Sequence, residues 1–186
     1  EQGKAMSPVE SSGLPGGEAI WGDYDNDQRP DLFFFTGAGG LYRNMGEGKF
    51  EQVDFPELPT VNSRGAVWGD FNQDGRLDLF VGGYEVWEQR VHPDVIFLNQ
   101  PDGSFKEVWR SPEGGCYSAR GVAAADLNED GKIDVYVSNY RLQPNHLWLN
   151  QGEGKFEESA ESYQAAGIGD GGTINYTGGI QYRVFG

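Results

Sequence analysis

Cysteine and histidine are almost missing from this sequence. Its 186 residues include one cysteine, Cys116, and two histidines, His92 and His146. A single cysteine excludes a disulfide within the chain and a cysteine-based zinc site. No Cys–His signature surrounds Cys116, so we expect a small buried residue there rather than a nucleophile. Neither histidine belongs to a nucleophile, base or zinc signature, and we expect both on the surface or at the rim of the fold.

Positive charge and long hydrophobic runs are also scarce. Asp and Glu total 29 against 14 Lys and Arg, which gives a net charge of −15. A chain this acidic is a poor partner for nucleic acid or for an anionic membrane surface. No apolar run approaches the roughly 18 to 20 residues that a membrane span needs, so we expect no direct membrane insertion. Instead, 29 glycines, 9 prolines and 13% aromatic residues favour many short strands and turns over helices.

The acidic residues gather in three short segments. These read DYDNDQRPD from Asp23, DFNQDGRLD from Asp70 and DLNEDGKID from Asp126, and each runs directly into apolar residues. They share the template D-x-[DN]-x-D-x-[RK]-x-D and hold ten of the aspartates. Like charges this close together repel one another unless a cation lies among them. The alternating spacing directs oxygens from successive loop residues towards one point.

The aspartate loops belong to a longer repeat of about 50 residues. A strand rich in small residues precedes each loop, and a second strand follows it. A third strand then leads into a Gly-containing hairpin turn and a fourth strand. The turns read NMGEGKF from Asn44, NQPDGSF from Asn99 and NQGEGKF from Asn150. Four strands in about 50 residues is the size of a β-propeller blade, so the sequence predicts an all-β fold of propeller blades.

We divide the chain into three clear four-stranded repeats and two flanking parts. These are an N-terminal segment 1–15, repeats 16–63, 64–118 and 119–166, and a partial fourth repeat or C-terminal strand at 167–186. Because a closed propeller has more blades, the predicted fold is an incomplete propeller or a part of a larger one. Three ways of completing it stay open: a longer protein, pairing with another copy, or a last strand that completes a blade of a partner.

The three loops are predicted to bind about three calcium ions with a structural role. Calcium takes six to eight oxygen ligands from a flexible loop, and these loops contain no His or Cys that would favour zinc or copper. Magnesium is the weaker candidate because it demands tighter octahedral geometry. The predicted ligands are the side chains at positions 1, 3, 5 and 9 and the main-chain carbonyl of position 7: Asp23, Asp25, Asp27, Arg29 and Asp31; Asp70, Asn72, Asp74, Arg76 and Asp78; Asp126, Asn128, Asp130, Lys132 and Asp134.

The loops differ from an EF-hand, which needs a bidentate Glu at position 12. The residues at that position are apolar here: Phe34, Val81 and Val137. The ninth aspartate is therefore the expected closing ligand. Gly75 and Gly131 permit the sharp turn at position 6, whereas Gln28 replaces this glycine in the first loop, where we expect less favourable geometry.

The motifs WGDFNQDGRLDLFV at 68–81, AADLNEDGKIDVYVSN at 124–139 and LYRNMGEGKF at 41–50 resemble the FG-GAP/VCBS repeat family. This family includes the calcium-loop blades of integrin α-subunit propellers and of many bacterial secreted proteins. The resemblance covers about residues 16–160. It implies a β-propeller, commonly of seven or eight blades, with calcium on the loops between the first two strands. The ligands named above fall on the family's ligand positions. The departures are Gln28 and the absence of an aspartate loop after Gly178.

No catalytic motif stands out in the sequence. It has no G-x-S-x-G elbow, phosphate loop or dinucleotide fingerprint, and its paired carboxylates are already assigned to calcium. We therefore expect no enzyme, and a glycan-active enzyme is the remaining enzymatic alternative. Five aromatic residues either pack between blades or form a stacking platform for sugar rings or a partner protein: Tyr84, Trp87, Trp109, Tyr117 and Tyr140.

The predicted function is that of a calcium-binding extracellular β-propeller repeat protein with an adhesion, scaffolding or assembly role. The alternative is a carbohydrate-binding or non-catalytic propeller part of a polysaccharide-degrading enzyme. The expected partner is a protein or glycan at the cell surface, with self-association or completion by another chain as a further option. Extracellular calcium would fill such sites, so we expect a secreted, periplasmic or cell-surface location. The chain opens at Glu1 without a starter Met, and we expect that a secretory signal was removed.

Overall fold

The structure is all-β. The computed structural model describes residues 14–37, 39–58, 63–86, 90–113, 116–140 and 143–167. Within these ranges the chain forms three four-stranded antiparallel sheets and a two-stranded hairpin, and none of it is helical. The same ranges accordingly hold no helix with the length and hydrophobicity of a membrane span. The predicted fold class of four-stranded propeller blades is confirmed. Trp87 and nearly all of the predicted partial fourth repeat lie outside the described residues.

Each sheet is one blade, built from strands that pair in an up-and-down order. The first blade consists of β1 (Ala19–Gly22), β2 (Asp31–Phe34), β3 (Gly40–Gly46) and β4 (Lys49–Val53). The second consists of β5 (Ala66–Gly69), β6 (Asp78–Val81), β9 (Val95–Asn99) and β10 (Phe105–Arg110). The third consists of β11 (Ala119–Ala125), β12 (Asp134–Asn139), β13 (His146–Gly152) and β14 (Lys155–Glu158). The hairpin of β7 (Glu85–Val86) and β8 (Arg90–Val91) interrupts the second blade. The predicted repeat boundaries within the connections stay predictions.

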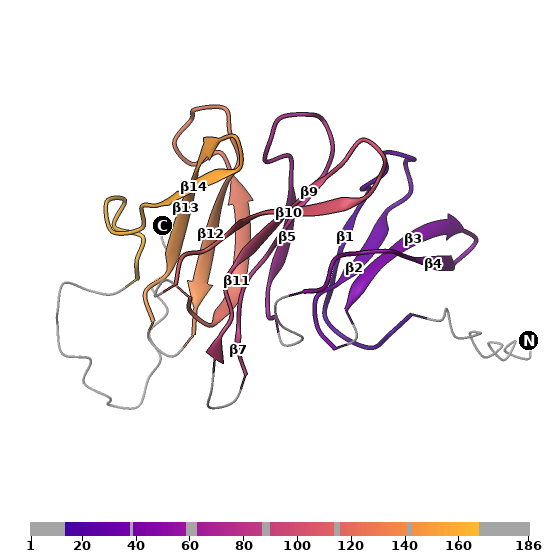
Figure 1. Ribbon diagram of the computed structural model, residues 1–186, viewed down its shortest axis with the longest axis horizontal. Helices are drawn as coiled ribbons and strands as arrows, with labels where there is room; N and C mark the ends of the chain where they lie inside the picture. Colours follow the sequence, from indigo (N-terminus) through magenta and orange to yellow (C-terminus); the bar gives the residue numbers. More distant parts are fainter. Residues whose placement is uncertain are drawn as a thin grey trace, which may run out of the picture.

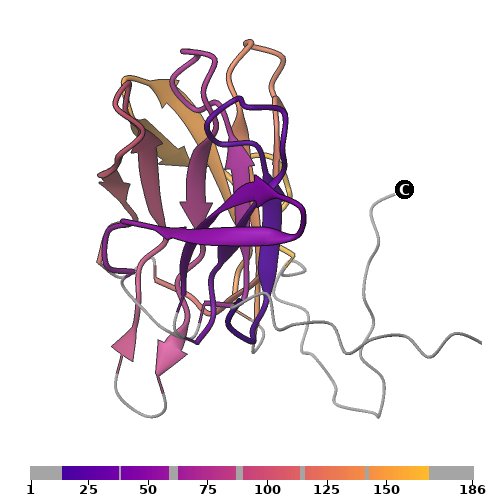
Figure 2. The same ribbon diagram turned by 90° about the vertical axis from the view of Figure 1, so that its right-hand side faces the viewer.

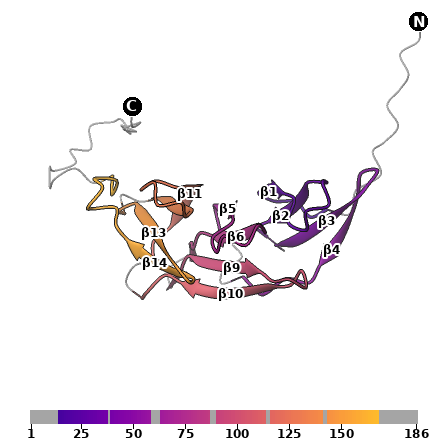
Figure 3. The ribbon, with the colours of Figure 1, turned by 90° about the horizontal axis from the view of Figure 1, so that it is seen from above.

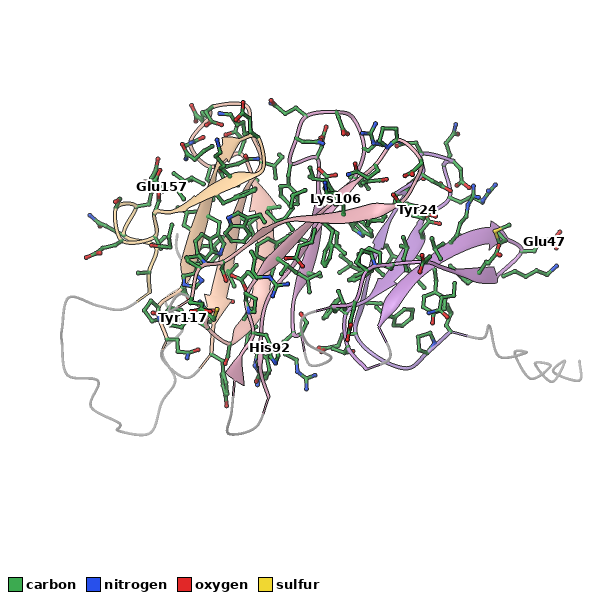
Figure 4. The ribbon with its side chains drawn as sticks, in the orientation of Figure 1. Tyr24, Glu47, His92, Lys106, Tyr117 and Glu157 are labelled. Atoms are coloured by element: carbon green, nitrogen blue, oxygen red, sulfur yellow. The ribbon has the colours of Figure 1, made fainter. Side chains whose placement is uncertain are left out.

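The three aspartate loops lie at the same end of the array. Each joins the first strand of its blade to the second, at the upper end in Figure 1. The β7–β8 hairpin projects from the opposite end, as Figure 2 shows. In Figure 4, Tyr24 of the first loop lies in the upper half, whereas His92 and Tyr117 lie towards the lower end. The fold therefore has two separate end surfaces. One carries the aspartate loops, and the other carries the connections between second and third strands and Tyr117 from the connection between two blades.

The blades stand side by side in an open arc (Figure 3). Hydrophobic side chains fill the space between neighbouring blades. Phe33 and Leu41 face the second blade, where the ring centroid of Trp68 lies 6.1 Å from that of Phe33. On its other face the second blade packs Phe80 and Ile96 against the third blade. Both faces of the second blade are thus buried against its neighbours.

The first strands of the blades line the inner side of the arc and approach one another closely (Figure 3). Gly65, just before β5, is an example of a required glycine there. A Cβ atom at this position would lie 2.6 Å from Cγ2 of Val122 on β11. The small residues of the first strands are thus explained by crowding at the inner edge of the arc.

The two outer blades end differently. Trp21 of β1 occupies the position that Trp68 occupies in β5, but Trp68 packs between blades while Trp21 is 60% exposed. On the last blade, Leu147 and Leu149 are covered by Ala160 from the segment that follows β14. The described sheets do not close into a ring. This arrangement is compatible with the predicted incomplete propeller.

One residue that we expected at the surface is buried. The ring of His146 stacks on Tyr117 with centroids 4.7 Å apart, and its Nδ1 lies 3.7 Å from Oδ2 of Asp94. The same Asp94 oxygen accepts the Nε1–H of Trp148 at 2.9 Å. The prediction was wrong because His146 and Trp148 are two residues apart on β13 and so point to the same face of the sheet. Both rings therefore lie between the second and third blades. Cys116 is half-buried, and burial raises the pKa of its thiol, as suits an unreactive residue.

Candidate metal sites

The three aspartate loops share one pattern of backbone hydrogen bonds. The carboxylate at position 1 accepts the N–H groups of positions 5 and 6 at 2.8 to 3.1 Å in every loop. The side-chain oxygen at position 3 accepts the N–H of position 5 at 3.1 to 3.2 Å. The carboxylate at position 5 accepts the N–H of position 7 at 2.9 to 3.0 Å. The acidic side chains are therefore held in place by the backbone of the turn to which they belong.

The first loop keeps the same backbone conformation despite its missing glycine. Position 4 is in the left-handed region in all three loops, with φ between 58° and 60°. Position 6 is left-handed as well, with φ of 70° at Gln28, 83° at Gly75 and 84° at Gly131. A non-glycine residue is disfavoured in this region by roughly 1 to 2 kcal/mol. The expected penalty at Gln28 therefore takes the form of local strain rather than of a different loop geometry.

Oxygen atoms converge inside the loops. In the first loop, carboxylate oxygens of Asp23, Asp25 and Asp27 all lie within 4.8 Å of one another. In the other loops, the amide oxygens of Asn72 and Asn128 make the hydrogen bond that Asp25 makes in the first. A set of carboxylate and amide oxygens in a short loop suits calcium, so the residues present fit the predicted ion. Bound calcium would supply the positive charge that holds these carboxylates together.

The ninth aspartates, Asp31, Asp78 and Asp134, are fully buried. In each of them one carboxylate oxygen accepts the N–H of loop position 2. The other oxygen accepts the N–H of an asparagine on the third strand, and all six bonds measure 2.8 to 3.2 Å. This anchors every loop to the third strand of its blade, a role that the spacing did not reveal. Each oxygen retains a further lone pair with which it can coordinate an ion. The role of these aspartates as closing metal ligands stays a prediction.

Burial and crowding raise the pKa of two of these aspartates. Burial, followed by the nearby carboxylates of Asp74 and Asp70, raises the pKa of Asp78 to about 6. Burial, followed by Asp25 and Asp27, likewise raises the pKa of Asp31. Burial and neighbouring negative charge thus make the ionised form of both carboxyl groups less favourable in free energy. A divalent cation in the loop would offset this cost.

The basic residue at position 7 has a side-chain role that was not predicted. Arg29 and Arg76 form ion pairs with the carboxylate at position 5 of their own loops, and Lys132 lies 2.9 Å from Asp130. The two arginines also donate through Nε to the carbonyl of the third-strand asparagine, at 2.8 and 2.9 Å. Hydrogen bonding to Lys132 lowers the pKa of Asp130. Coordination through the main-chain carbonyl of position 7 stays a prediction.

A second basic side chain belongs to the first loop. On β3, Arg43 places Nε 2.6 Å from Oδ2 of Asp25 and Nη2 3.2 Å from Oδ2 of Asp27. The corresponding positions in the other two repeats hold Leu98 and Leu149. The first loop therefore combines its additional carboxylate, Asp25, with an additional cation.

The balance of charge is the same in all three loops. The first sets four ligand-position carboxylates against two guanidinium groups, and each of the others sets three carboxylates against one basic side chain. Two negative charges remain in every loop at the predicted ligand positions. This remainder equals the charge of one divalent cation per loop.

Parts of known proteins are similar to this chain. A family model described as FG-GAP-like repeat matches residues 23–81, 86–137 and 126–178. Cartilage acidic protein 1 of Xenopus tropicalis is 37% identical over 59 residues, which make up 31% of this chain and 9% of that protein. A solved structure that concerns recognition of non-reducing terminal N-acetylglucosamine by an Agrocybe aegerita lectin has 21% identity and a TM-score of 0.48, over 75% of this chain and 37% of the lectin chain. The chain thus spans less than two thirds of the length of either protein. Because the family model matches most of the sequence in three consecutive units, the chain belongs to the FG-GAP-like repeat family.

Proposed function

We propose that this chain is a calcium-stabilised set of propeller blades that acts as a non-catalytic interaction module with an adhesion, scaffolding or assembly role. The observation that carries the proposal is the pair of negative charges left in each loop after its own basic side chains are counted. One calcium ion per loop neutralises that charge at short range. About three ions would then be bound by the described blades.

The ions stabilise the fold because the loops sit directly beside the hydrophobic core. Each loop runs into a second strand whose residues are buried, such as Leu79 and Val81 in the second blade. Repulsion among the carboxylates would strain this junction, and an ion that binds the folded loop but not the unfolded chain adds its binding free energy to stability. Calcium thus stabilises the first hairpin of each blade.

We place the protein outside the cytoplasm: secreted, periplasmic or on the cell surface. Calcium sites of extracellular modules have dissociation constants of about 10⁻⁴ to 10⁻³ M, and resting cytosol would leave sites of that strength empty. The similar protein of Xenopus tropicalis is named for cartilage, which supports an extracellular location here. The partner would be a protein or glycan at the cell surface, or a second chain that completes the propeller.

Isothermal titration calorimetry of the chelator-stripped chain tests the calcium proposal. We expect about three ions per chain and the loss of about one ion in each of the double variants Asp23→Asn/Asp27→Asn and Asp70→Asn/Asp74→Asn. The control Glu153→Gln removes a highly exposed acid from a hairpin turn and should leave the number of ions unchanged. Binding that is weak, non-stoichiometric and insensitive to the loop variants would overturn the proposal.

A glycan-binding role is the second candidate, and a cluster at the end opposite the loops favours it. The guanidinium of Arg120 lies 4.4 Å from the ring centroid of Tyr140 and 5.8 Å from that of Tyr84, over which Arg64 also lies at 5.8 Å. Flat aromatic and guanidinium surfaces of this kind suit the faces of sugar rings. Trp109 does not belong to this cluster, because it packs against Trp148 with ring centroids 5.0 Å apart.

A glycan array with the calcium-loaded chain separates the two candidates. Glycan binding that is lost in Tyr140→Ala and kept in the exposed-turn control Glu153→Gln would favour the glycan role. No binding on the array, combined with capture of a protein from the native source, would favour adhesion or assembly. Hydrolysis of a bound glycan that depends on one acid outside the loops would replace both with an enzyme.

A further inference from the structure

Two buried asparagines connect neighbouring aspartate loops. Asn99 donates its backbone N–H to Asp78 of its own loop at 2.9 Å. Its side-chain Nδ2 donates to the carbonyl of Leu77, also in its own loop, at 3.3 Å, and to the carbonyl of Tyr24 in the loop of the preceding blade at 2.8 Å. Asn99 therefore contacts two loops at once from a position that is 2% exposed.

Asn150 repeats the arrangement one blade further along. Its backbone N–H donates to Asp134 at 2.8 Å, and its Nδ2 donates to Ile133 of its own loop at 3.2 Å and to Phe71 of the preceding loop at 2.8 Å. The same three bonds thus occur at both junctions between blades. The recurrence indicates a feature of the repeat rather than an accident of one contact.

The carbonyls that accept these cross-blade bonds belong to residues whose side chains enter the next blade. Tyr24 packs on Phe105 and Phe71 packs on Phe156, with ring centroids 5.9 and 6.0 Å apart. The N–H groups of these same residues donate to the ninth aspartates of their own loops. The residue at position 2 is therefore bonded to its own loop through its N–H group and to the next blade through its carbonyl group.

A third link runs across the surface of the loops. The side chain of Gln73 at position 4 of the second loop donates to the carbonyl of Gly131 at position 6 of the third loop, at 2.7 Å. Asn26 of the first loop makes the corresponding bond to Gly75 at 3.5 Å. Position 6 is where the backbone is left-handed in every loop, so this bond depends on the turn of the next loop being formed.

We propose that these links make calcium binding cooperative along the array, with Asn99 and Asn150 as the positioning residues that couple one loop to the next. The inference rests on the proposed calcium-dependent function. An ion in the first loop orders the carbonyl of Tyr24, which accepts a bond from Asn99, and Asn99 also donates to Asp78 of the second loop. Asn150 joins Phe71 of the second loop to Asp134 of the third in the same way. The neighbour is then preorganised before its own ion arrives. Because coupling between sites is reciprocal, ions in either loop tighten binding in the other.

Asn44 provides an internal control for this coupling. It occupies the same place in the first blade, and it donates its backbone N–H to Asp31 at 2.8 Å and its Nδ2 to Pro30 at 2.9 Å. Both partners belong to its own loop, and the part of the chain that the structure describes holds no loop before it. Replacing Asn44 with Ala removes its side-chain bond within one loop, whereas replacing Asn99 with Ala removes the corresponding side-chain bond and the cross-blade bond. The backbone bonds to Asp31 and Asp78 are kept in both variants.

Calcium titration of the full chain, followed by calorimetry and by the change in tryptophan fluorescence, tests the coupling. We expect the wild type to bind about three ions with a Hill coefficient above one. An ion in one loop should raise the calcium affinity of the neighbouring loop by about tenfold. Asn99→Ala should still bind ions, but the first loop should titrate independently of the second. Asn44→Ala should weaken the first site while leaving the steep binding of the second and third unchanged.

Gln73→Ala provides a second test if Asn99→Ala does not fold. The side chain of Gln73 is at the surface and is not a predicted calcium ligand, so this variant should fold. It should lower the Hill coefficient between the second and third sites without changing the number of ions. Three ions bound by the wild type without cooperativity, or with a steepness that neither variant changes, would overturn the coupling alone. A wild type that binds no calcium would overturn the proposed function and the coupling together.

Discussion

The first and second aspartate loops reach the same geometry with different residues. The second has Asn72 and Gly75 at positions 3 and 6, and the first has Asp25 and Gln28, yet the hydrogen bonds and the left-handed turns are the same. Arg43 pairs with the additional carboxylate of the first loop and keeps its balance of charge equal to that of the second. The comparison teaches that the turn and the residual charge are what the repeat retains, while the residues that provide them vary.

Removing calcium should have the largest effect, and it should affect both loops alike. Each filled site adds about 2.7 kcal/mol to the free energy of unfolding when free calcium exceeds the dissociation constant 100-fold. Excess chelator should therefore lower the melting temperature by many degrees, and added calcium should restore it, as scanning calorimetry can measure. An unchanged melt after verified metal removal contradicts the site assignment. A calcium effect that survives Asp23→Asn/Asp27→Asn but not Asp70→Asn/Asp74→Asn would break the equivalence of the two loops.

Truncating a ninth aspartate should come next in size. Asp31→Ala and Asp78→Ala each leave two buried backbone N–H groups without an acceptor, at a cost of about 1 to 3 kcal/mol for each group. We expect a loss of about 3 kcal/mol in the free energy of unfolding for either variant, measured by urea denaturation in chelator. The exposed-turn variant Glu47→Ala should change it by less than about 0.5 kcal/mol. A small effect at Asp31 alone would mean that the first loop is not anchored as the second is.

Asp78 should give the metal-free chain a pH dependence. Its pKa of about 6 in the folded chain lies above its ordinary value of 3.8, so the folded state takes up a proton at a higher pH than the unfolded state does. The free energy of unfolding should therefore rise as the pH falls from about 6 to about 4. Relative to Asp78→Asn, the wild type should gain about 2 kcal/mol over this range in urea denaturation. The pKa of Asp31 is raised as well, so comparison with Asp31→Asn should show a change of the same sign. A relative loss on acidification would contradict both.

Replacing Arg43 with the leucine found at the corresponding positions sharpens the comparison of charge. Arg43→Leu leaves three negative charges in the first loop. The metal-free chain should lose about 0.5 to 1 kcal/mol of stability, because a partly exposed ion pair is lost. Calcium affinity of the first site should rise severalfold, because attraction for the ion increases. The double variant Asp25→Asn/Arg43→Leu reproduces the charges of the second loop at the ligand positions and should reverse both changes. Weaker calcium binding in Arg43→Leu would show that Arg43 positions the loop rather than balancing its charge.

The smallest effect is expected at position 6. Gln28→Gly removes a non-glycine residue from the left-handed region and should stabilise the chain by about 0.5 to 1 kcal/mol. The matched reverse variant, Gly75→Gln, should destabilise it by a similar amount. Urea denaturation of both variants in the presence of calcium provides the measurement. Changes of the same sign in the two variants would mean that side-chain contacts, and not backbone strain, distinguish the loops.

The strands and the loops could be predicted because their signals are local. The strands rich in small residues, the glycine-containing hairpin turns and the nine-residue aspartate template each depend on near neighbours in the chain. The strands of all three blades lie where these patterns indicated. His146 shows where such reasoning fails. Its neighbours in sequence do not reveal that Tyr117 covers its ring or that Asp94 lies beside it, so it was expected at the rim.

The sequence by itself determined the order of strand, loop and strand and the supply of oxygen atoms in each loop, because these follow from residues within about ten positions of one another. The recurrence of this pattern along the chain also revealed the repeat. Only the tertiary structure decided which basic side chain meets which carboxylate and which asparagine joins neighbouring loops. Arg43 reaches Asp27 across 16 residues, and Asn99 reaches Tyr24 across 75. The first contact arises when β3 pairs within its blade, and the second arises when two blades pack face to face. That packing depends on the shapes of many side chains together rather than on any short pattern.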